Sequence, residues 1–243
     1  MGRHGTIAGR KAAQDNKRAA IFTKHARLIM VAAKAGGDPD YNPALRQAID
    51  RAKGAGMPND NIKRAIQKGT GELGGETYEE VVFEGYGAGG VAVVIEGLTD
   101  NRNRITSAVK HAFDKWGGNM GVPGCVSYMF EKKGVFTVDK ESGATEDSLM
   151  EIALDAGADD IVTYDDSFEV VCAPDAFNDV NDALKAAGVE IVECDIDQVP
   201  NVESTPTDPA AIKNLKRMIS ELEDNDDVQK VYTNCTVDLY DED

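Results

Sequence analysis

The sequence is poor in the residues that build metal centres and nucleophilic sites. Its 243 residues include four cysteines and three histidines. No two cysteines form a C-x-x-C pair, and the histidines lie on different segments: Cys125, Cys172, Cys194, Cys235; His4, His25, His111. We therefore expect no metal site, no cofactor, no catalytic residues and no disulfide framework, with the thiols buried and reduced. The chain is predicted not to be an enzyme.

Long apolar runs are also missing. No stretch approaches the roughly 18 apolar residues of a membrane span, so no membrane partner is expected. The opening MGRHGTIAGRKAAQ is basic but has no apolar core, which excludes a secretory signal. An Arg- and Ala-rich transit peptide is the less favoured alternative. We expect a cytoplasmic protein.

A glycine-rich motif and two acidic clusters resemble known binding sites but lack the neighbouring sequence or the spacing that such sites require. Gly85, Gly87 and Gly90 match G-x-G-x-x-G, but the apolar run Val91–Ile95 after them predicts a strand rather than the helix of a dinucleotide site. A glycine-rich hairpin is favoured. The acidic clusters 224–227 and 241–243 lack the spacing of a calcium loop and are interpreted as solvated surface or a frayed tail.

What the sequence does have is a division of charge. The net charge is −17, yet Met1 to Gly75 holds 14 Lys and Arg against 6 Asp and Glu, a net of +8. The remaining 168 residues have 12 basic and 37 acidic groups, a net of −25. Such a split indicates a localised face that binds a polyanion.

The basic part has the periodicity of short helices. Apolar residues around Ile21–Ala32 predict a helix that ends at Gly36-Gly37, and Asn42-Pro43 predicts a capped start for the next one. A third start at Pro58-Asn59-Asp60 leads to a stop at Gly69. We predict a basic helical nucleic-acid-binding domain over 1–75, with 69–75 as a linker.

After residue 75 the pattern changes to strands and helices. Strands at 81–84, 91–98 and 126–130 surround a helix that starts at Asp100/Asn101 and carries Trp116 on its apolar face; a helix after Asp208-Pro209 and a strand at 228–237 close the chain. Between them, strands at 135–138, 161–164, 168–172 and 189–194 and two helices follow the β-α-β-β-α-β order of a ferredoxin-like unit. We predict an α+β multi-domain protein in which a ferredoxin-like domain (133–204) is inserted into a discontinuous α+β domain (76–132 and 205–243).

The basic residues supply the candidate contacts. In a continuous helix over 3–24, Arg3, Arg10, Lys17 and Lys24 recur every seven residues and form a cationic sector with Lys11 and Arg18. A solvated charged face is the alternative. Two basic residues in Asn101–Arg104 form a second candidate, for which ordinary capping is equally favoured. The predicted nucleic-acid-binding residues are Arg3, His4, Arg10, Lys11, Lys17, Arg18, Lys24, Arg27, Lys63, Arg64, Lys68, Arg102 and Arg104.

Several long motifs resemble the YebC/PmpR family, which includes the mitochondrial translational activator of cytochrome c oxidase. They are Arg10–Asp15, Lys17-Arg18, Ile21–Lys24, Ala48–Lys53, Met57–Ile62, Lys68–Gly71, Tyr86–Val91 and Leu98–Arg104. The resemblance implies a basic helical N-terminal domain, two α/β domains with one inserted in the other, and a cytoplasmic, non-enzymatic regulator. The start departs from the family's H-S-K-W-x-N-I-K-H, because His4–Arg10 lacks the Trp and the neighbouring Lys.

These observations lead to one main hypothesis and several rivals. The main one is a cytosolic nucleic-acid-binding regulator of gene expression, a DNA-binding transcription regulator by resemblance, with a monomer favoured. The alternative is a ribosome- or ribosomal-RNA-associated translation factor. A small-molecule sensor that uses the ferredoxin-like unit is less favoured, and a protein-interaction adaptor is a third class.

Overall fold

The computed structural model describes residues 18–74 and 77–240. Within these ranges the chain forms two compact units. The first unit holds residues 18–126, apart from 75–76, together with Pro206–Val231; the second holds Ser127–Thr205 and residues 232–240. The chain therefore leaves the first unit after residue 126 and returns to it at Pro206. Each unit is described by itself.

Three helices open the first unit: α2 (Arg18–Ala33), α3 (Pro43–Gly54) and α4 (Asn59–Gly69). They start and stop close to the predicted positions. The Asn42 side chain accepts a hydrogen bond from the Leu45 N–H at 3.1 Å, and Pro43 occupies the first turn, as the Asn-Pro pair predicted. Apolar residues at helical spacing from all three helices, among them Ile29, Leu45 and Ile62, make a shared core.

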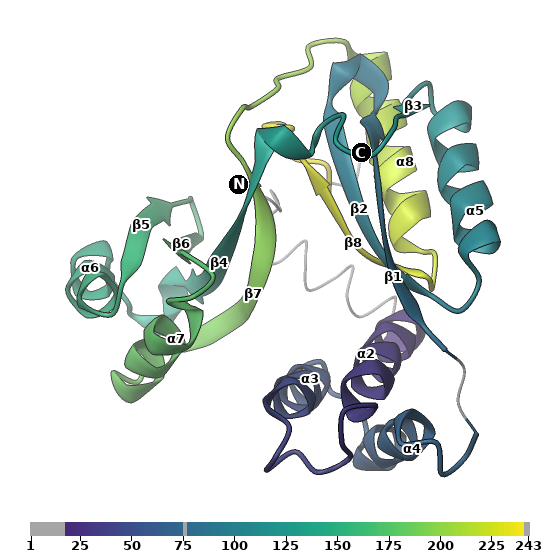
Figure 1. Cartoon of the computed structure of the whole chain (residues 1–243). Helices are drawn as coiled ribbons and strands as arrows, with labels where there is room; N and C mark the ends of the chain where they lie inside the picture. The colour runs from purple at the N-terminus through teal and green to yellow at the C-terminus, as the bar shows by residue number, and fades with distance from the viewer. Residues whose placement is uncertain (1–17, 75–76, 241–243) are drawn as a thin grey trace. The chain divides into compact units, whose positions relative to one another are not determined.

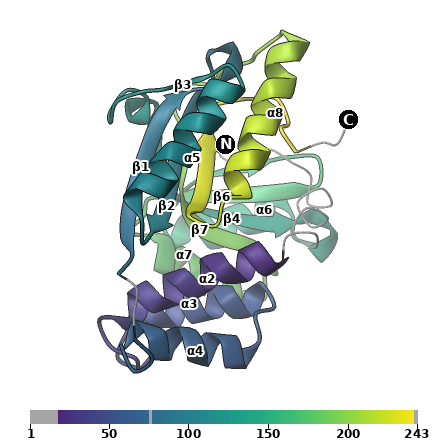
Figure 2. The ribbon, with the colours of Figure 1, turned by 90° about the vertical axis from the view of Figure 1, so that its right-hand side faces the viewer.

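The first sheet follows, with strand order β3-β1-β2-β8. Its strands are β1 (Glu79–Tyr86), β2 (Ala92–Thr99), β3 (Asn119–Met120) and β8 (Val228–Thr233). β1 pairs antiparallel with β2 and with β3. Helices α5 (Arg102–Lys115) and α8 (Pro209–Glu223) lie side by side over one face of this sheet (Figures 1 and 2).

Glycines let the first sheet and its helices approach closely. A Cβ at Gly87 would come within 2.7 Å of Leu215 Cδ1 on α8, and one at Gly97 within 2.5 Å of Ile105 Cδ1 on α5. The β1–β2 connection contains a short 3-10 turn, Ala88–Gly90, in which Gly89 has a φ of 76°. The G-x-G-x-x-G motif is thus a hairpin, as the sequence favoured.

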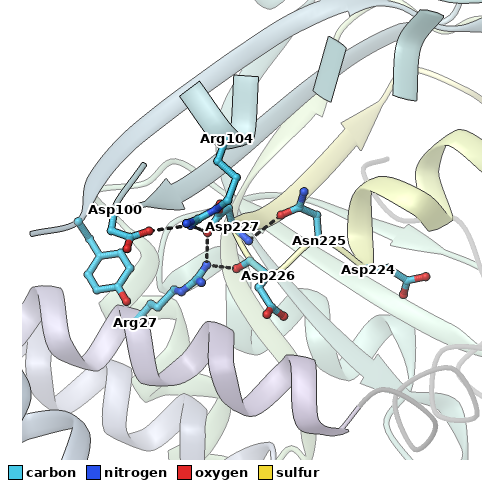
Figure 3. A pocket seen from close by; sticks show the side chains of 8 residues that line it. Arg27, Asp100, Arg104, Asp224, Asn225, Asp226 and Asp227 are labelled. Carbon is cyan, nitrogen blue, oxygen red and sulfur yellow. Dashed lines mark hydrogen bonds and ion pairs between the residues drawn. The ribbon is translucent and has the colours of Figure 1, made fainter. Parts of the chain in front are cut away.

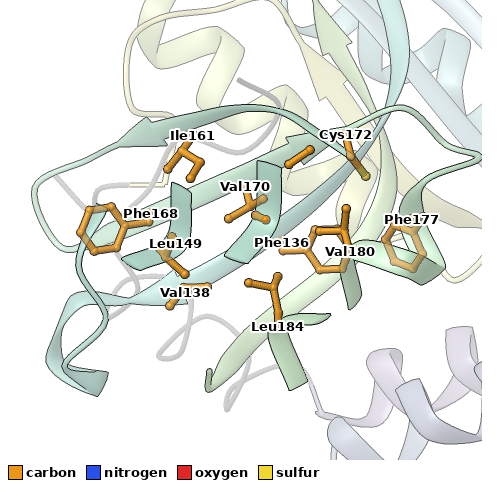
Figure 4. Close-up of a cluster of buried hydrophobic side chains, with 12 residues drawn as sticks. Phe136, Val138, Leu149, Ile161, Phe168, Val170, Cys172, Phe177, Val180 and Leu184 are labelled. Carbon is orange, nitrogen blue, oxygen red and sulfur yellow. The ribbon is translucent and has the colours of Figure 1, made fainter. Parts of the chain in front are cut away.

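The second unit contains a second four-stranded sheet with strand order β5-β6-β4-β7, all neighbours antiparallel. In chain order its elements are β4 (Phe130–Asp139), α6 (Glu146–Asp155), β5 (Ala158–Thr163), β6 (Ser167–Cys172), α7 (Phe177–Ala186) and β7 (Ile191–Pro200). The two helices and the sheet enclose one apolar core, in which Phe136 stacks on Phe177 with centroids 4.7 Å apart (Figure 4). The predicted β-α-β-β-α-β element order is confirmed.

Some sequence predictions are wrong in detail. The strand expected at 126–130 is a 3-10 turn (Ser127–Met129), and β4 begins only at Phe130. Trp116 caps α5 rather than lying within it, and β8 ends at Thr233 instead of residue 237. The two-residue strand β3 was not foreseen, because such a short strand has no periodicity of its own. None of the four cysteines forms a disulfide, but only Cys172 and Cys235 are buried, while Cys125 and Cys194 are partly exposed.

Candidate nucleic-acid interface

Helix α4 presents a cluster of cations to solvent. Its apolar residues Ile62 and Ala65 are buried against α2, so the opposite side of the helix must face outward. Lys63, Arg64 and Lys68 are all exposed. Across the described ranges, none of these three side chains takes part in a hydrogen bond or an ion pair. We call these three residues the α4 face.

Arg27 and Arg104, by contrast, are both bound to one buried carboxylate. Arg104 Nε lies 2.8 Å from Asp227 Oδ2, and its Nη2 lies 2.8 Å from Oδ1. Arg27 Nη1 lies 2.8 Å from the same Oδ1 and also donates to the backbone carbonyl of Asp226 (Figure 3). The side chain of Asp227 is 4% exposed and that of Arg27 is 11% exposed. These three residues form the Asp227 cluster.

The cluster carries strong electrostatic coupling. Burial by itself would raise the pKa of Asp227, but the hydrogen bond from Arg104 and the positive charges of Arg27 and Arg104 outweigh it and hold that pKa below its ordinary value. The same contacts raise the pKa of Arg104, chiefly through its hydrogen bonds with Asp227 and Asp100. The charged state of the cluster is therefore favoured at neutral pH.

The surface around the cluster does not suit phosphate. It is hollowed to a volume of about 510 Å³, lined by Arg27, Tyr78, Asp100, Arg104, Asp224, Asn225, Asp226 and Asp227. Four carboxylates face two guanidinium groups there, so the hollow has a net negative charge. The interpretation of 224–227 as solvated surface is wrong for Asp227, which is buried and joins α2, α5 and the segment before β8.

The other predicted contacts are spread out. Arg102 is exposed and pairs with Glu79 at 3.1 Å. Asn101 caps α5 by accepting a hydrogen bond from the Arg104 N–H, as the alternative of ordinary capping predicted. Lys24, the last member of the predicted heptad row, donates to the Glu223 carbonyl at 2.8 Å. Arg18 is the first residue of α2. Arg3, His4, Arg10, Lys11 and Lys17 lie outside the described residues.

Sequence reasoning missed a cluster around Trp116, the chain's single tryptophan. Its Nε1 donates to Glu221 Oε2 at 2.8 Å, and the Lys115 ammonium lies 2.7 Å from the same oxygen. Lys115 and Arg217 each place a cation near the indole ring, at 4.8 and 5.4 Å from its centroid. No spacing rule links residues about 100 positions apart, so only the pairing of α5 with α8 brings them together.

No cluster of three metal-ligating side chains occurs in the described ranges, and none of the helices there is long and apolar enough to cross a membrane. Fold and surface together thus define a class: an α+β protein that joins a basic three-helix region to two four-stranded sheets with their covering helices.

Comparison with known proteins identifies the family. Residues 3–72 match the model of the TACO1/YebC protein N-terminal domain, and residues 78–235 match that of the TACO1/YebC second and third domain. The chain belongs to the TACO1/YebC family, as its motifs predicted. This is a family of probable transcriptional regulators rather than of enzymes.

Individual relatives match along nearly their full lengths. A probable transcriptional regulatory protein of Clostridioides difficile is 51% identical over 239 residues, which covers 98% of this chain and 100% of the relative. Another from Desulfotalea psychrophila is 50% identical, with 96% and 93% covered. The crystal structure of a conserved hypothetical protein from Aquifex aeolicus is 42% identical and superposes with a TM-score of 0.83 over 91% of both chains.

Proposed function

We propose that this protein regulates gene expression by binding nucleic acid through its basic N-terminal region. The observation that carries the proposal is the α4 face, where three exposed cations are left without ionic partners among the described residues. Unpaired cations on a helix are suited to phosphate contacts, because binding then releases counterions from the nucleic acid without first breaking an ion pair. The relatives named as probable transcriptional regulatory proteins support a role in transcription.

The charge of the rest of the chain supports a one-sided interaction. The segment 127–205 contains 4 basic and 20 acidic residues, a net of −16. A polyanion is repelled by such a surface and attracted to the N-terminal region, which restricts its approach. Arg27 contributes to the fold rather than to this face, since Asp227 neutralises it. The candidates that remain for direct contact are the α4 face and the basic residues 3–18.

The proposal is tested by removing charge from the α4 face. The double variant Lys63→Gln/Lys68→Gln is expected to bind duplex DNA about tenfold more weakly at moderate salt, and to flatten the slope of log K against log salt by about 0.9 for each phosphate that is no longer neutralised. The measurement is fluorescence anisotropy of a labelled duplex across a salt titration. Lys17→Glu/Arg18→Glu extends the same test to Arg18, the first residue of α2, and to Lys17, which precedes it in the sequence.

A matched control variant has the same net charge as the α4 variant. Lys132→Gln/Lys185→Gln also removes two positive charges, from exposed positions in the second unit. This control is expected to bind like the wild type. Equal affinity and salt slope for the α4 variant and the wild type would overturn the assigned face, and absence of wild-type binding to any nucleic acid would overturn the function.

DNA and ribosomal RNA present the same phosphate chemistry to this face. We take DNA as the target because the relatives are named as transcriptional regulatory proteins. Crosslinking in cells followed by sequencing of the bound nucleic acid separates the two: recovery of promoter DNA supports a transcriptional role, and recovery of ribosomal RNA replaces it with a role in translation.

We further propose three domains, with boundaries near residues 75, 132 and 205, and a ferredoxin-like fold for the inserted one. The element order and the strand order β5-β6-β4-β7 support this fold. The proposed working form is a cytoplasmic monomer.

A further inference from the structure

The acidic part of the chain contains a local exception to its charge. Helices α5 and α8 together hold 7 of the 12 basic residues found after Gly75 and only 3 of the 37 acidic ones. These 29 helical residues have a net charge of +4, whereas the other residues after Gly75 have a net charge of −29. The two helices lie side by side on one face of the first sheet (Figure 2).

The cations on this surface differ in how they are used. Arg102 and Arg104, at the start of α5, are bound to Glu79, Asp100 and Asp227. Further along, Lys110 on α5 and Lys213 on α8 are exposed and form no ion pair or hydrogen bond within the described part of the chain. Arg217 is also exposed, and its guanidinium contacts the ring of Trp116. Lys110, Lys115, Lys213, Lys216 and Arg217 are called the α5–α8 face.

Helix packing accounts for the apolar side of both helices but not for this charge. The side of each helix that faces the sheet is apolar and buried. It holds Val109 and Phe113 on α5, and Leu215 and Met218 on α8. The outer side of the two helices needs only to be polar. Because acidic residues outnumber basic ones after Gly75, this side would be expected to be acidic as well. Cations gathered on an outer helical side, inside a chain segment of strongly negative charge, favour an anionic partner by charge complementarity.

We propose that the α5–α8 face is a second contact surface for the phosphate backbone of the nucleic acid that the α4 face binds. The inference rests on the proposed function and extends it, because it adds a surface outside the basic N-terminal region. Lys110, Lys213 and Arg217 contact phosphate groups. Lys115 is held by Glu221 and keeps its position beside Trp116.

Trp116 supplies an internal reporter of this contact. The indole is partly exposed and has cations on α5 and α8 within 5.4 Å of its ring centroid. A phosphate drawn to Arg217 changes the charge next to the ring and therefore its emission. Since Trp116 is the only tryptophan in the chain, tryptophan fluorescence reports on the surroundings of this one residue.

The test compares three double variants that each remove two positive charges: Lys110→Gln/Lys213→Gln on the α5–α8 face, Lys63→Gln/Lys68→Gln on the α4 face, and Lys132→Gln/Lys185→Gln as the control. Anisotropy of a labelled duplex DNA gives affinity and salt slope, and Trp116 emission is recorded in the same titrations. For Lys110→Gln/Lys213→Gln we expect about tenfold weaker binding and a salt slope flatter by about 0.9 for each phosphate that is no longer neutralised. Wild-type emission should change with the same midpoint as the anisotropy.

The outcomes separate the two proposals. If the α4 variant is weakened while the α5–α8 variant behaves like the control and Trp116 emission stays constant during binding, the second surface is overturned and the proposed function stands. If the wild type binds neither duplex DNA nor an RNA hairpin of equal length, both proposals fail. Melting temperatures of the variants equal to that of the wild type confirm that weaker binding does not come from unfolding.

Discussion

Asp227 joins segments of the first unit that lie far apart in the chain. Its carboxylate accepts from Arg27 on α2 and from Arg104 on α5, residues that are 200 and 123 positions away in the chain. Because the carboxylate and the Arg27 guanidinium are both largely buried, each depends on the other for compensation of its lost hydration. The sequence showed an acidic run at 224–227 but gave no indication that one of its members is internal.

Replacing this carboxylate should therefore destabilise the fold. Asp227→Asn is expected to lower the free energy of unfolding by about 3 kcal/mol, since it leaves Arg27 buried without a counter-charge. Asp226→Asn is the matched control: its side chain is exposed, and a change within about 0.5 kcal/mol is expected. Urea denaturation measures both.

Acid should reduce the effect of Asp227→Asn. The folded-state pKa of Asp227 lies below the ordinary value of 3.8, so the stabilisation from its charge is complete above that value and is lost as the pH falls through the folded-state pKa. The gap in unfolding free energy between wild type and Asp227→Asn should be largest near neutral pH and smaller near pH 3, within the range about 3–7. A gap that stays constant over this range would contradict the assigned role of the charge.

At the scale of elements, apolar spacing predicted the buried side of a helix, but it did not predict a short strand that forms through close contact with a neighbouring strand. The helical spacing of Ile105, Val109 and Phe113 predicted the buried side of α5, and these residues are buried. Neither that pattern nor any other indicated β3, which is two residues long and lies against β1. β3 pairs with Gly85 and Tyr86 of β1, and at Gly85 a side chain would occupy the space of the β3 backbone.

Gly85→Ala is expected to destabilise the first sheet. A Cβ at this position would lie 2.5 Å from the Asn119 carbonyl oxygen and 2.9 Å from Phe113 Cε1, so β3 or α5 must shift. Overpacking of this kind costs about 1–3 kcal/mol. Thermal unfolding measures the change, with Gly54→Ala at the end of α3 as the control, because a Cβ there meets nothing within 4 Å. Equal melting temperatures for the two variants would refute the close contact.

For the whole molecule, charge differs between regions of the chain rather than being spread evenly. Residues 18–74 have 10 basic and 5 acidic groups, whereas residues 127–205 have 4 and 20. Like charges at this density repel one another and oppose the compact state, and salt screens that repulsion over distances of about 10 Å at 0.1 M. The second unit therefore bears an electrostatic cost that the helical region does not.

Salt should stabilise the second unit in particular. Raising sodium chloride from about 0.02 to about 0.5 M is expected to slow amide exchange in the strands β4 and β6 more than in α2–α4, because only the former lie in the strongly acidic segment. Hydrogen exchange with mass spectrometry resolves both regions in one experiment. Equal slowing in the two regions would show that the effect is not one of local charge.

By itself the sequence determined the order of the helices and of the longer strands, the caps at Asn42, Asn101 and Asp208, the hairpin at Gly85–Gly90 and the division of charge near residue 75. These properties depend on residues that are neighbours in the chain, through helical or strand periodicity and local hydrogen bonds such as that of Asn42. Only the tertiary structure decided which cations are available. Arg27 and Arg104 are both paired with Asp227, whereas Lys63 and Lys68 form no ion pair within the described part of the chain. Helix α8 brings Arg217 to Trp116. Coulomb interactions act over distances in space, and the distances between residues 100 to 200 positions apart exist only once the chain has folded.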